Sequence, residues 1–253
     1  MTLNNFDNNN IDYMNSRPLD VHTWSDYSEV NDFVDDIYLL LKSIKGHKKG
    51  NKRLLKVLLL DLYVAWTADP DLKIMFSRDN NAYKAKSRYN ELHISKKIRD
   101  IVDVMVEEGI VYEKQGFNDR VSGIGFQSRL WATDGLIEQF KAAKFSQFQI
   151  HSHEAREPVV LRDEVKKDIE DYKDTPFVIS ARSLLADYNQ LLAKTHIDIY
   201  DLERPVLEIG EGKKKMRLQI NQQDKFVRRI FNNRRWDQGG RFYGGWWQRC
   251  PKD

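Results

Sequence analysis

The side chains best suited to chemistry lie near the end of the chain, in the stretch from Trp236 to Asp253. It reads WDQGGRFYGGWWQRCPKD, with two glycine pairs, arginines and several large aromatic side chains in a short space. Glycine lets a backbone approach a ligand closely, a guanidinium binds phosphate, and an aromatic ring stacks on a flat group. The combination predicts contact with an anionic ligand that carries flat rings, as a nucleic acid does.

The distribution of charge favours the same partner. Residues 151–211 carry 14 Asp and Glu against 8 Lys and Arg, whereas residues 212–252 carry 12 Lys and Arg against 2 Asp and Glu. Most charged runs are simply solvated, but a basic segment with interleaved aromatic residues is typical of a nucleic-acid surface. We therefore expect Arg234, Arg235 and Trp236 to support the binding of a polyanion.

Histidines and carboxylates between residues 151 and 171 raise the question of metal-dependent hydrolysis. His151 and His153 form a lone His-x-His pair, and Asp168 and Asp171 follow on the same polar stretch. A metal site needs at least three ligands held together, and no cysteine lies near these histidines. We expect this stretch to be exposed, so we assign no metal, no cofactor and no catalytic residue, and a hydrolase is the weakest alternative.

Composition limits the class of protein further. The single cysteine, Cys250, excludes an internal disulfide and fits a reducing compartment. No apolar run approaches the roughly 20 residues of a membrane span, and the polar start MTLNNFDNNN lacks the layout of a signal peptide. We expect a soluble, cytoplasmic protein that binds no membrane, with residues 1–27 as a disordered tail because this start has little to bury.

Hydrophobic periodicity predicts the elements between the two ends. Helices are expected at 28–44 and 52–68, each apolar on one side only. Residues 146–176 are interpreted as a polar, acidic connector with an extended segment, PVVLRD, near its middle. A helix at 179–194 and a hairpin over 205–220 follow. In that helix Arg182 and Asn189 are expected to be available to a ligand, and the inward side chains are expected to be Ala181, Leu184, Leu185, Tyr188 and Leu192.

The middle of the chain predicts helices around a β-hairpin. Ser95 is a good N-cap for a helix that runs to Glu108, with Gly109 at its C′ position. The following EEGIVYEKQGF…SRLWAT predicts strands at 110–113 and 128–133 joined by a glycine-rich loop, and a helix at 134–144. In this order of elements, residues 52–145 resemble a winged helix, the helix-turn-helix variant with a β-hairpin wing.

The resemblance to a winged helix implies how this region contacts DNA. The helix beginning at Ser95 would enter the major groove through Lys96, Lys97 and Arg99, and Arg120 in the loop would reach a phosphate or the minor groove. The basic side chains that precede this helix favour DNA, namely Lys84, Lys86 and Arg88. The alternative is that the domain binds only proteins, as many winged helices do.

Asp237, Gly240, Arg241 and Tyr243 fit the pattern Asp-x-x-Gly-Arg-x-Tyr. This pattern resembles the template-contacting motif of single-subunit, bacteriophage-type RNA polymerases, which are relatives of family-A DNA polymerases. The run from LRDEVKKDIEDYKDTP to RIFNNRRWDQGGRFYGGWWQ is also similar to phage- and plasmid-borne polymerase-like proteins. The resemblance implies that Arg241 contacts the template backbone and Tyr243 packs or stacks there. It also implies that Gly240 allows close approach and that Asp237 is a buried, orienting carboxylate.

The polymerase resemblance also implies what this chain does not do. Nucleotidyl transfer requires carboxylates that hold two metal ions, and in this class they follow the Gly-Arg-x-Tyr motif. Only ten residues follow Tyr243, so we expect residues 177–253 to be an incomplete polymerase-like segment, inactive by itself, with Mg²⁺ needed only by a full-length relative. An interrupted gene, a split gene or a cloned fragment would explain this end. The alternative is that Trp246 and Trp247 anchor the fold.

The sequence thus predicts a mostly α fold with small β-hairpins (α+β), in which a winged helix is followed by the start of a polymerase-like domain. The expected function is that of the nucleic-acid-binding N-terminal portion of a polymerase-like replication protein, with duplex and single-stranded DNA as partners. The alternative is a plasmid or phage replication initiator or a transcriptional regulator. A regulator would prefer one duplex site, whereas a fragment would show little sequence preference.

Overall fold

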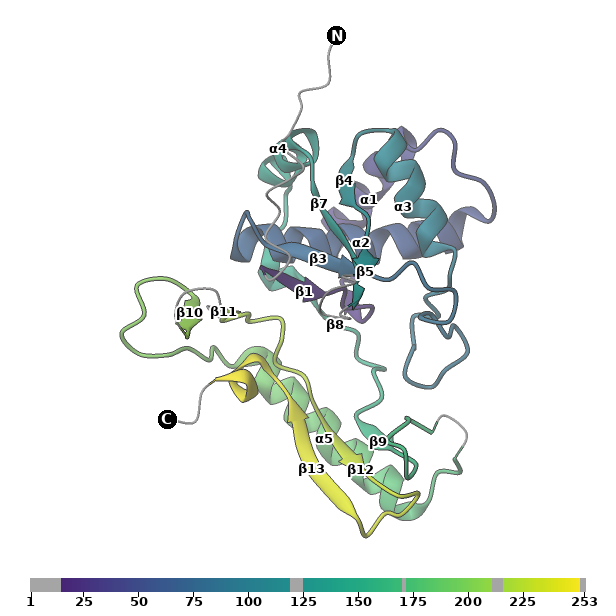
Figure 1. Ribbon diagram of the computed structural model, residues 1–253, viewed down its shortest axis with the longest axis vertical. Coiled ribbons are helices and arrows are strands. Elements are labelled where there is room, and N and C mark those ends of the chain that lie inside the picture. Colours follow the sequence, from purple (N-terminus) through teal and green to yellow (C-terminus); the bar gives the residue numbers. More distant parts are fainter. Residues whose placement is uncertain (1–14, 119–124, 170–171, 211–215, 251–253) are drawn as a thin grey trace. The chain divides into compact units, whose positions relative to one another are not determined.

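The computed structural model describes residues 15–118, 125–169, 172–210 and 216–250, and the chain forms two compact units (Figure 1). The first unit contains Met1–Val21, Asp26–Tyr83 and Ser95–Gln147, and the second contains His22–Ser25, Lys84–Ile94 and Phe148–Asp253. Each unit combines helices with small sheets, so the fold is mixed α+β and not mostly α.

A long central helix, α2 (Lys48–Ala68), organises the first unit. Every residue from Leu54 to Ala65 is buried, because α2 packs against α1 (Ser28–Leu40), α3 (Ile98–Glu107) and the strands β3 (Lys73–Phe76) and β7 (Ser128–Ala132). The expectation of a helix apolar on one side only was wrong for α2. Its leucine-rich middle segment is surrounded by the other elements.

One basic and one acidic side chain are buried on α2, and each has a partner. Lys56 donates a hydrogen bond from Nζ to Oδ1 of Asn31 at 2.8 Å, and burial lowers its pKa to about 8. Asp61 forms an ion pair with Arg17, in which Nη2 of Arg17 lies 2.5 Å from Oδ1 of Asp61. The backbone amide of Asp20 donates to Oδ2 of Asp61 at 3.2 Å. Burial raises the pKa of Asp61 to about 6, against the opposite effect of Arg17.

Arg17 belongs to strand β1 (Ser16–Pro18), which pairs in parallel with β3. Strand β2 (Thr23–Trp24) follows, and it pairs with β8 (His151–Ser152) in the second unit. The prediction of a disordered tail over residues 1–27 was therefore wrong from Asn15 onward. Backbone pairing and the buried Asp61 hold this part of the chain in place, and residues 1–14 lie outside the described residues.

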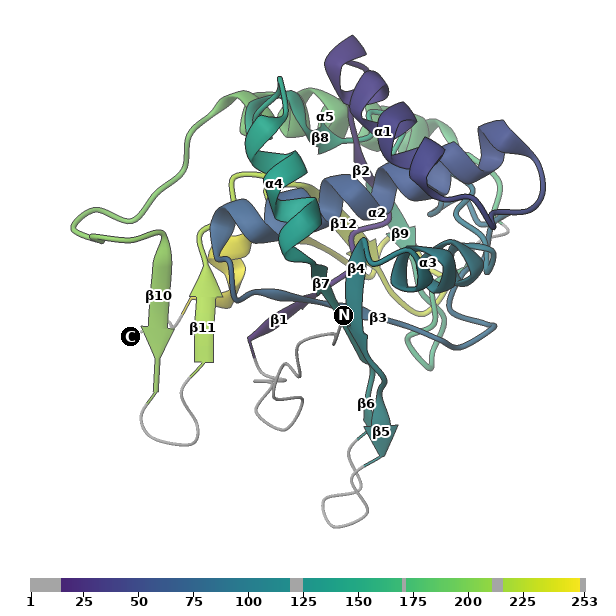
Figure 2. The ribbon, with the colours of Figure 1, turned by 90° about the horizontal axis from the view of Figure 1, so that it is seen from above.

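The sheet of the first unit has the strand order β1-β3-β7-β4. Strand β7 lies antiparallel to both β3 and β4 (Val111–Lys114), helix α3 leads into β4, and helix α4 (Asp134–Ala142) follows β7. The short hairpin β5 (Phe117–Asn118) and β6 (Gly125–Phe126) continues outward from β4 and β7 (Figure 2). The predicted strands and helices of this region are confirmed, with ends shifted by at most three residues.

The two ends of α3 differ in how well local sequence predicted them. The helix begins at Ile98, its N-cap is Lys97, and no side chain caps it, so the prediction of Ser95 as N-cap was wrong. Residues 95–97 form a turn in which the carbonyl of Ser95 accepts from the amide of Ile98. At the other end Gly109 has φ +68°, and the amide of Ile110 donates to the carbonyl of Met105, which completes a Schellman C-cap and confirms the predicted C′ position of Gly109.

The second unit contains a three-stranded sheet covered by one helix. Strand β12 (Val227–Phe231) lies between β13 (Gly239–Gly244), which is antiparallel to it, and β9 (Val159–Leu161), which is parallel. Helix α5 (Pro176–Lys194) packs along the sheet (Figure 1). The shared core consists of Val159, Leu161, Val178, Ala181, Leu185 and Phe231.

Two predictions for the second unit were wrong. Residues 146–176 are more than a connector, because Val159–Leu161 in the expected extended segment form β9 and contribute to the core. On α5, the side chains of Leu184 and Tyr188 are 67% and 43% exposed although an inward position was expected.

The predicted hairpin is confirmed as β10 (Val206–Ile209) and β11 (Met216–Gln219). Short 3-10 helices span Gln147–Gln149 and Trp246–Arg249.

Candidate nucleic-acid interface

The Gly-Arg-x-Tyr motif forms strand β13. The pairing of this strand with β12 places Arg241 opposite Ile230 and Tyr243 opposite Arg228. Since side chains two residues apart point to the same face of a strand, Arg241 and Tyr243 share a face with Arg228 beside them. Arg241 is exposed, and Tyr243 is 39% exposed. The register therefore brings a cation and an aromatic ring together on one accessible surface.

The opposite face of β13 carries a second exposed ring. Phe242 is 51% exposed, lies opposite Arg229, and has its ring 6.2 Å from that of Tyr188 on α5. The guanidinium of Arg229 lies over the rings of Phe231 and Phe242 and donates from Nε to the carbonyl of Gly240 at 2.8 Å. Arg229 is thus held by the protein itself, whereas Arg241 has no side-chain partner among the described residues.

The fold of this unit itself requires glycine at position 240. Its φ is +70°, a conformation that other residues rarely adopt, and an added Cβ would lie 2.8 Å from both Arg229 and Phe231. The close approach that the motif implied therefore occurs within the protein, between β13 and the side chains of β12.

The outer edge of β13 is closed by Gln248. Its amide accepts a hydrogen bond from the amide of Gly244 at 3.1 Å and donates one to the carbonyl of Phe242 at 3.1 Å. These are two groups that a neighbouring strand would otherwise pair with.

Trp246 is buried, so the interpretation of the terminal tryptophans as an anchor is confirmed for this residue. Trp247 stays partly exposed.

The turn between β12 and β13 carries the other predicted basic residues. Arg234 and Arg235 are both exposed, and Arg234 Nε lies 3.7 Å from a carboxylate oxygen of Glu164. Arg235 bonds both carboxylate oxygens of Asp237, at 2.8 and 2.5 Å. Asp237 is exposed, so its prediction as a buried carboxylate was wrong: it lies in the turn, and the bond from Arg235 lowers its pKa.

Trp236 is the predicted aromatic residue of this turn, and it packs inward. Its ring lies 5.3 Å from Phe231 and 5.1 Å from Tyr172 in edge-to-face contacts beside the core. It therefore contributes to the stability of the turn that presents Arg234 and Arg235.

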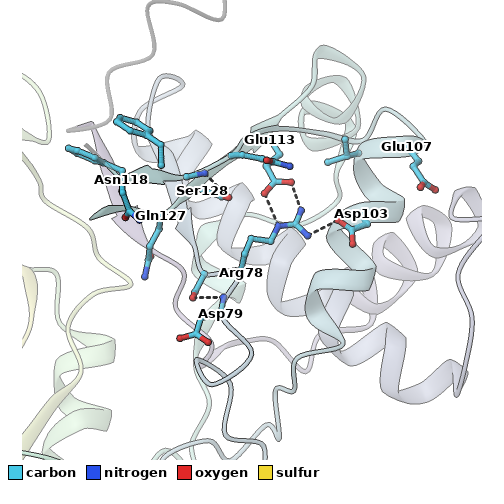
Figure 3. Close-up of a pocket in the computed structure, with 14 residues that line it drawn as sticks. Arg78, Asp79, Asp103, Glu107, Glu113, Asn118, Gln127 and Ser128 are labelled. Atoms are coloured by element: carbon cyan, nitrogen blue, oxygen red, sulfur yellow. Dashed lines mark hydrogen bonds and ion pairs between the residues drawn. The ribbon is translucent and has the colours of Figure 1, made fainter. Parts of the chain in front are cut away.

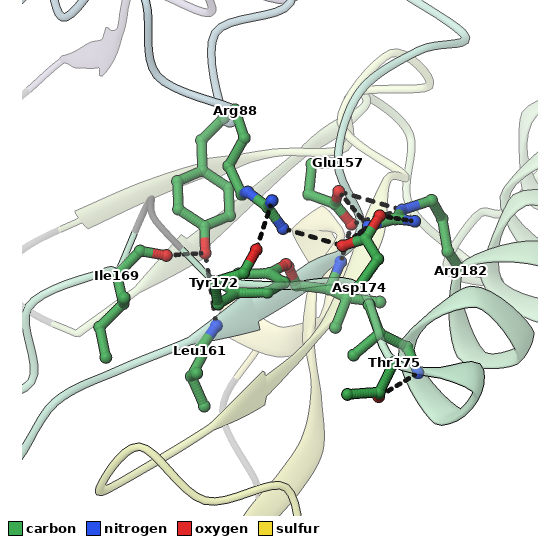
Figure 4. Close-up of polar contacts among 11 residues, drawn as sticks. Arg88, Glu157, Leu161, Ile169, Tyr172, Asp174, Thr175 and Arg182 are labelled. Carbon is green, nitrogen blue, oxygen red and sulfur yellow. Dashed lines mark hydrogen bonds and ion pairs between the residues drawn. The ribbon is translucent and has the colours of Figure 1, made fainter.

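A network of polar contacts in the second unit uses residues that were expected to be available to a ligand (Figure 4). Arg88 lies over the ring of Tyr172, 3.6 Å from its centroid, and donates to the Tyr172 carbonyl at 2.9 Å. Arg182 forms ion pairs with Glu157 and Asp174, each at 2.9 Å, and its bonds hold the pKa of Asp174 below its usual value. These interpretations as ligand-binding residues were wrong, because both guanidinium groups join segments of this unit.

Asn189 was also expected to be available to a ligand. Its side-chain amide instead bonds the backbone of Val227 at the start of β12, at 2.8 and 2.7 Å. Asn189 thus connects the helix to the sheet, and its polarity alone did not reveal that role.

The basic residues predicted on α3 lie at its N-terminal end and differ in accessibility. Lys96 and Lys97 are exposed, whereas Arg99 is half-buried and donates from Nη1 to the carbonyl of Arg78 at 2.9 Å. Arg120 lies outside the described residues. Along the helix itself the exposed charges are acidic, namely Asp100, Asp103, Glu107 and Glu108. This charge is opposite to what a DNA groove requires.

Among residues 15–118, 125–169, 172–210 and 216–250, no group of three side chains suited to a metal ion occurs. His153 accepts a hydrogen bond at Nδ1 from the amide of Ala155 and contacts Trp24 edge to face, and Asp168 bonds Arg162 at 2.7 Å. In that same part of the chain no helix has the length and apolar character required to span a membrane.

None of the family models, curated proteins or solved structures compared with this chain matches it. The geometry of the second unit therefore carries the functional argument. Residue types alone did not identify Arg228 as a neighbour of Tyr243, and they did not show that Phe242, within the motif, lies on the other face of the strand. The alternation of side chains along two paired strands would have given both positions once β12 was aligned with β13.

Proposed function

We propose that this protein binds single-stranded nucleic acid along β13, with Arg241 bonding the phosphate backbone and Tyr243 stacking on a base. The observation that carries the proposal is the β12–β13 register, which puts these two exposed side chains on one face. A guanidinium two residues from an aromatic ring matches the alternation of phosphate and base in a strand whose bases are unpaired.

The expected energies are sufficient for binding of moderate strength. Stacking of one base on an aromatic side chain contributes about 1–3 kcal/mol, and each neutralised phosphate adds a salt-dependent contribution. Arg228 lies beside Tyr243, and Arg234 and Arg235 lie in the turn at one end of the same strands. A bound strand that follows β13 toward this turn would meet these further cations.

The proposal includes kinship with the template-contacting segment of single-subunit polymerases. Gly240, Arg241 and Tyr243 support that kinship through their order and shared strand. Asp237 does not contribute, because it is exposed and bonded to Arg235. The proposed role is to bind a strand, and no residue is assigned to catalysis.

A second candidate function is recognition of duplex DNA through a winged helix in the first unit. The order β3-β7-β4, with α3 leading into β4 and the β5–β6 hairpin as a wing, favours this candidate. The acidic face of α3 opposes insertion of the helix along a groove, so the contacts would be restricted to Lys96, Lys97 and the wing. The single-strand proposal therefore has the stronger support.

Fluorescence anisotropy with a labelled single strand and the duplex of the same sequence tests the proposal. We expect the single strand to bind more tightly and with little sequence preference. Its affinity should fall with salt, with a log–log slope of about −2 to −3 if three or four phosphates are neutralised. Binding that is absent or independent of salt would contradict the proposal, and tighter, sequence-dependent binding of duplex would favour the second candidate.

A further inference from the structure

A pocket of about 940 Å³ lies in the first unit between α3, the segment after β3 and the β5–β6 hairpin (Figure 3). Its charged lining consists of one guanidinium and four carboxylates, those of Arg78, Asp79, Asp103, Glu107 and Glu113. The pocket therefore has a net negative charge, in a protein whose overall charge is positive.

Arg78 is fully engaged by two of the four carboxylates. It donates from Nε to Glu113 at 2.9 Å and from Nη1 to Asp103 at 2.6 Å, and its remaining nitrogen also bonds Glu113. Figure 3 shows the guanidinium between these two side chains. These hydrogen bonds outweigh the effect of burial and raise the pKa of Arg78, so the group stays charged. One cation is thus shared between two anions.

The other two carboxylates have no cationic partner among the described residues. Asp79 accepts a hydrogen bond from the amide of Asn81 at 2.9 Å, and Glu107 accepts one from the hydroxyl of Ser43 at 3.4 Å. Both side chains are exposed, and both line the pocket. Uncharged donors occupy one oxygen of each, so their negative charge is not neutralised at the pocket.

Apolar surface accompanies this negative charge. Val106 on α3 and Phe117 on β5 are 38% and 45% exposed, and the ring of Phe117 is stacked on that of Phe126 with centroids 5.0 Å apart. All three side chains line the pocket. Exposed apolar side chains with polar groups around them are typical of a surface for another protein.

We infer that this pocket docks a basic segment of a partner protein. Basic side chains of the segment bond Asp79 and Glu107, each carboxylate by its own lysine or arginine, and apolar side chains beside them pack on Val106 and Phe117. Charge complementarity identifies the occupant: four carboxylates against one guanidinium attract a cationic peptide and repel the phosphates of a nucleic acid. This site lies in the first unit and does not depend on the strand-binding proposal for β13.

Anisotropy with three labelled peptides tests the inference on the full chain. The probes are GKLRKLRG, which is basic and apolar, GKGRKGRG, which is basic only, and GELDELDG, which is acidic. The first should bind most tightly and the third not at all. The double variant Asp79→Asn with Glu107→Gln should weaken binding of the first peptide about three- to tenfold, because two exposed ion pairs are lost.

The control removes the same two charges from α1, outside the pocket, by Asp32→Asn with Asp36→Asn. This double variant should bind the first peptide as the unmodified protein does, and circular dichroism should show both variants folded. Equal weakening in the two double variants, or no binding of the first peptide by the unmodified protein, would overturn the inference. So would duplex DNA that binds the unmodified protein and loses affinity in the pocket variant.

Discussion

The side-chain amide of Asn189 on α5 forms two hydrogen bonds with the backbone of Val227, as a neighbouring strand would. Nδ2 of Asn189 donates to the Val227 carbonyl at 2.8 Å, and Oδ1 of Asn189 accepts from the Val227 amide at 2.7 Å. Asn189→Ala should lower the free energy of unfolding by roughly 1–3 kcal/mol, because both backbone groups lose their partner. Alanine favours a helix more than asparagine, so a loss cannot come from helix propensity.

Urea denaturation followed by tryptophan fluorescence measures the effect of Asn189→Ala. Gln190→Ala is the matched control, since Gln190 is the next residue on α5 and is exposed. Its unfolding free energy should stay within about 0.5 kcal/mol of the unmodified protein. Equal stability of the two variants would show that the Asn189 hydrogen bonds do not stabilise the sheet.

Gln248 should protect the edge of β13. Replacement by alanine removes the acceptor for the Gly244 amide, so this amide should exchange with solvent faster in hydrogen-exchange measurements by NMR. Gln248→Glu keeps an acceptor for Gly244 but loses the donor to Phe242, and it should preserve most of the protection. An unchanged exchange rate in Gln248→Ala would mean that the edge is closed by other means.

Gly240→Ala should destabilise the second unit. The positive φ and the contacts with Arg229 and Phe231 together predict a loss of about 1–3 kcal/mol in the free energy of unfolding. Gly50→Ala is a suitable control, because Gly50 lies in the first turn of α2 and its added Cβ meets only ordinary contacts. That variant should be as stable as the unmodified protein or slightly more so. The opposite order would refute this account of the motif glycine.

The buried carboxyl of Asp61 should make stability depend on pH. Burial raises its pKa from 3.8 to about 6, so between these values the folded state binds a proton that the unfolded state releases. The contribution of Asp61 to the free energy of unfolding should therefore fall as pH rises from about 4 to about 6. In urea denaturation, the fall in the free energy of unfolding across this window should be smaller by roughly 1–3 kcal/mol in Asp61→Asn than in the unmodified protein, whereas Asp36→Asn should leave it unchanged. Parallel curves for all three proteins would contradict this explanation.

Local signals in the sequence predicted much of the first unit. The Schellman cap at Gly109 depends on a few neighbouring residues, and a glycine-rich loop marks the two strands β4 and β7 on either side of it. The burial of α2 on all sides was missed, although the leucine-rich segment LLKVLLLDL around Asp61 was a signal for it. Ser95 failed as a cap because a turn over residues 95–97 precedes the helix.

The interactions that local sequence did not predict join residues far apart in the chain. Strand β9 pairs with β12 about 70 residues later, and no short-range pattern marks that pairing. The same holds for Arg88 with Asp174 and Arg182 with Glu157, whose partners decide that these guanidinium groups are structural. For the candidate interface, sequence identified Arg241 and Tyr243, and the strand register then showed which side chains lie beside them.

The central claim is tested most directly by single-strand binding of Arg241→Ala and Tyr243→Ala, measured by fluorescence anisotropy against Arg204→Ala. Arg204 is exposed and lies outside the three-stranded sheet, so its replacement removes the same charge from another surface. We predict that Arg241→Ala weakens binding about tenfold and makes the slope of log affinity against log salt concentration shallower by about 0.7. Tyr243→Ala should weaken binding about five- to hundredfold and leave this slope unchanged. Arg204→Ala should have little effect on either. Equal affinities for all three variants and the unmodified protein would contradict the assignment of β13 as the nucleic-acid interface.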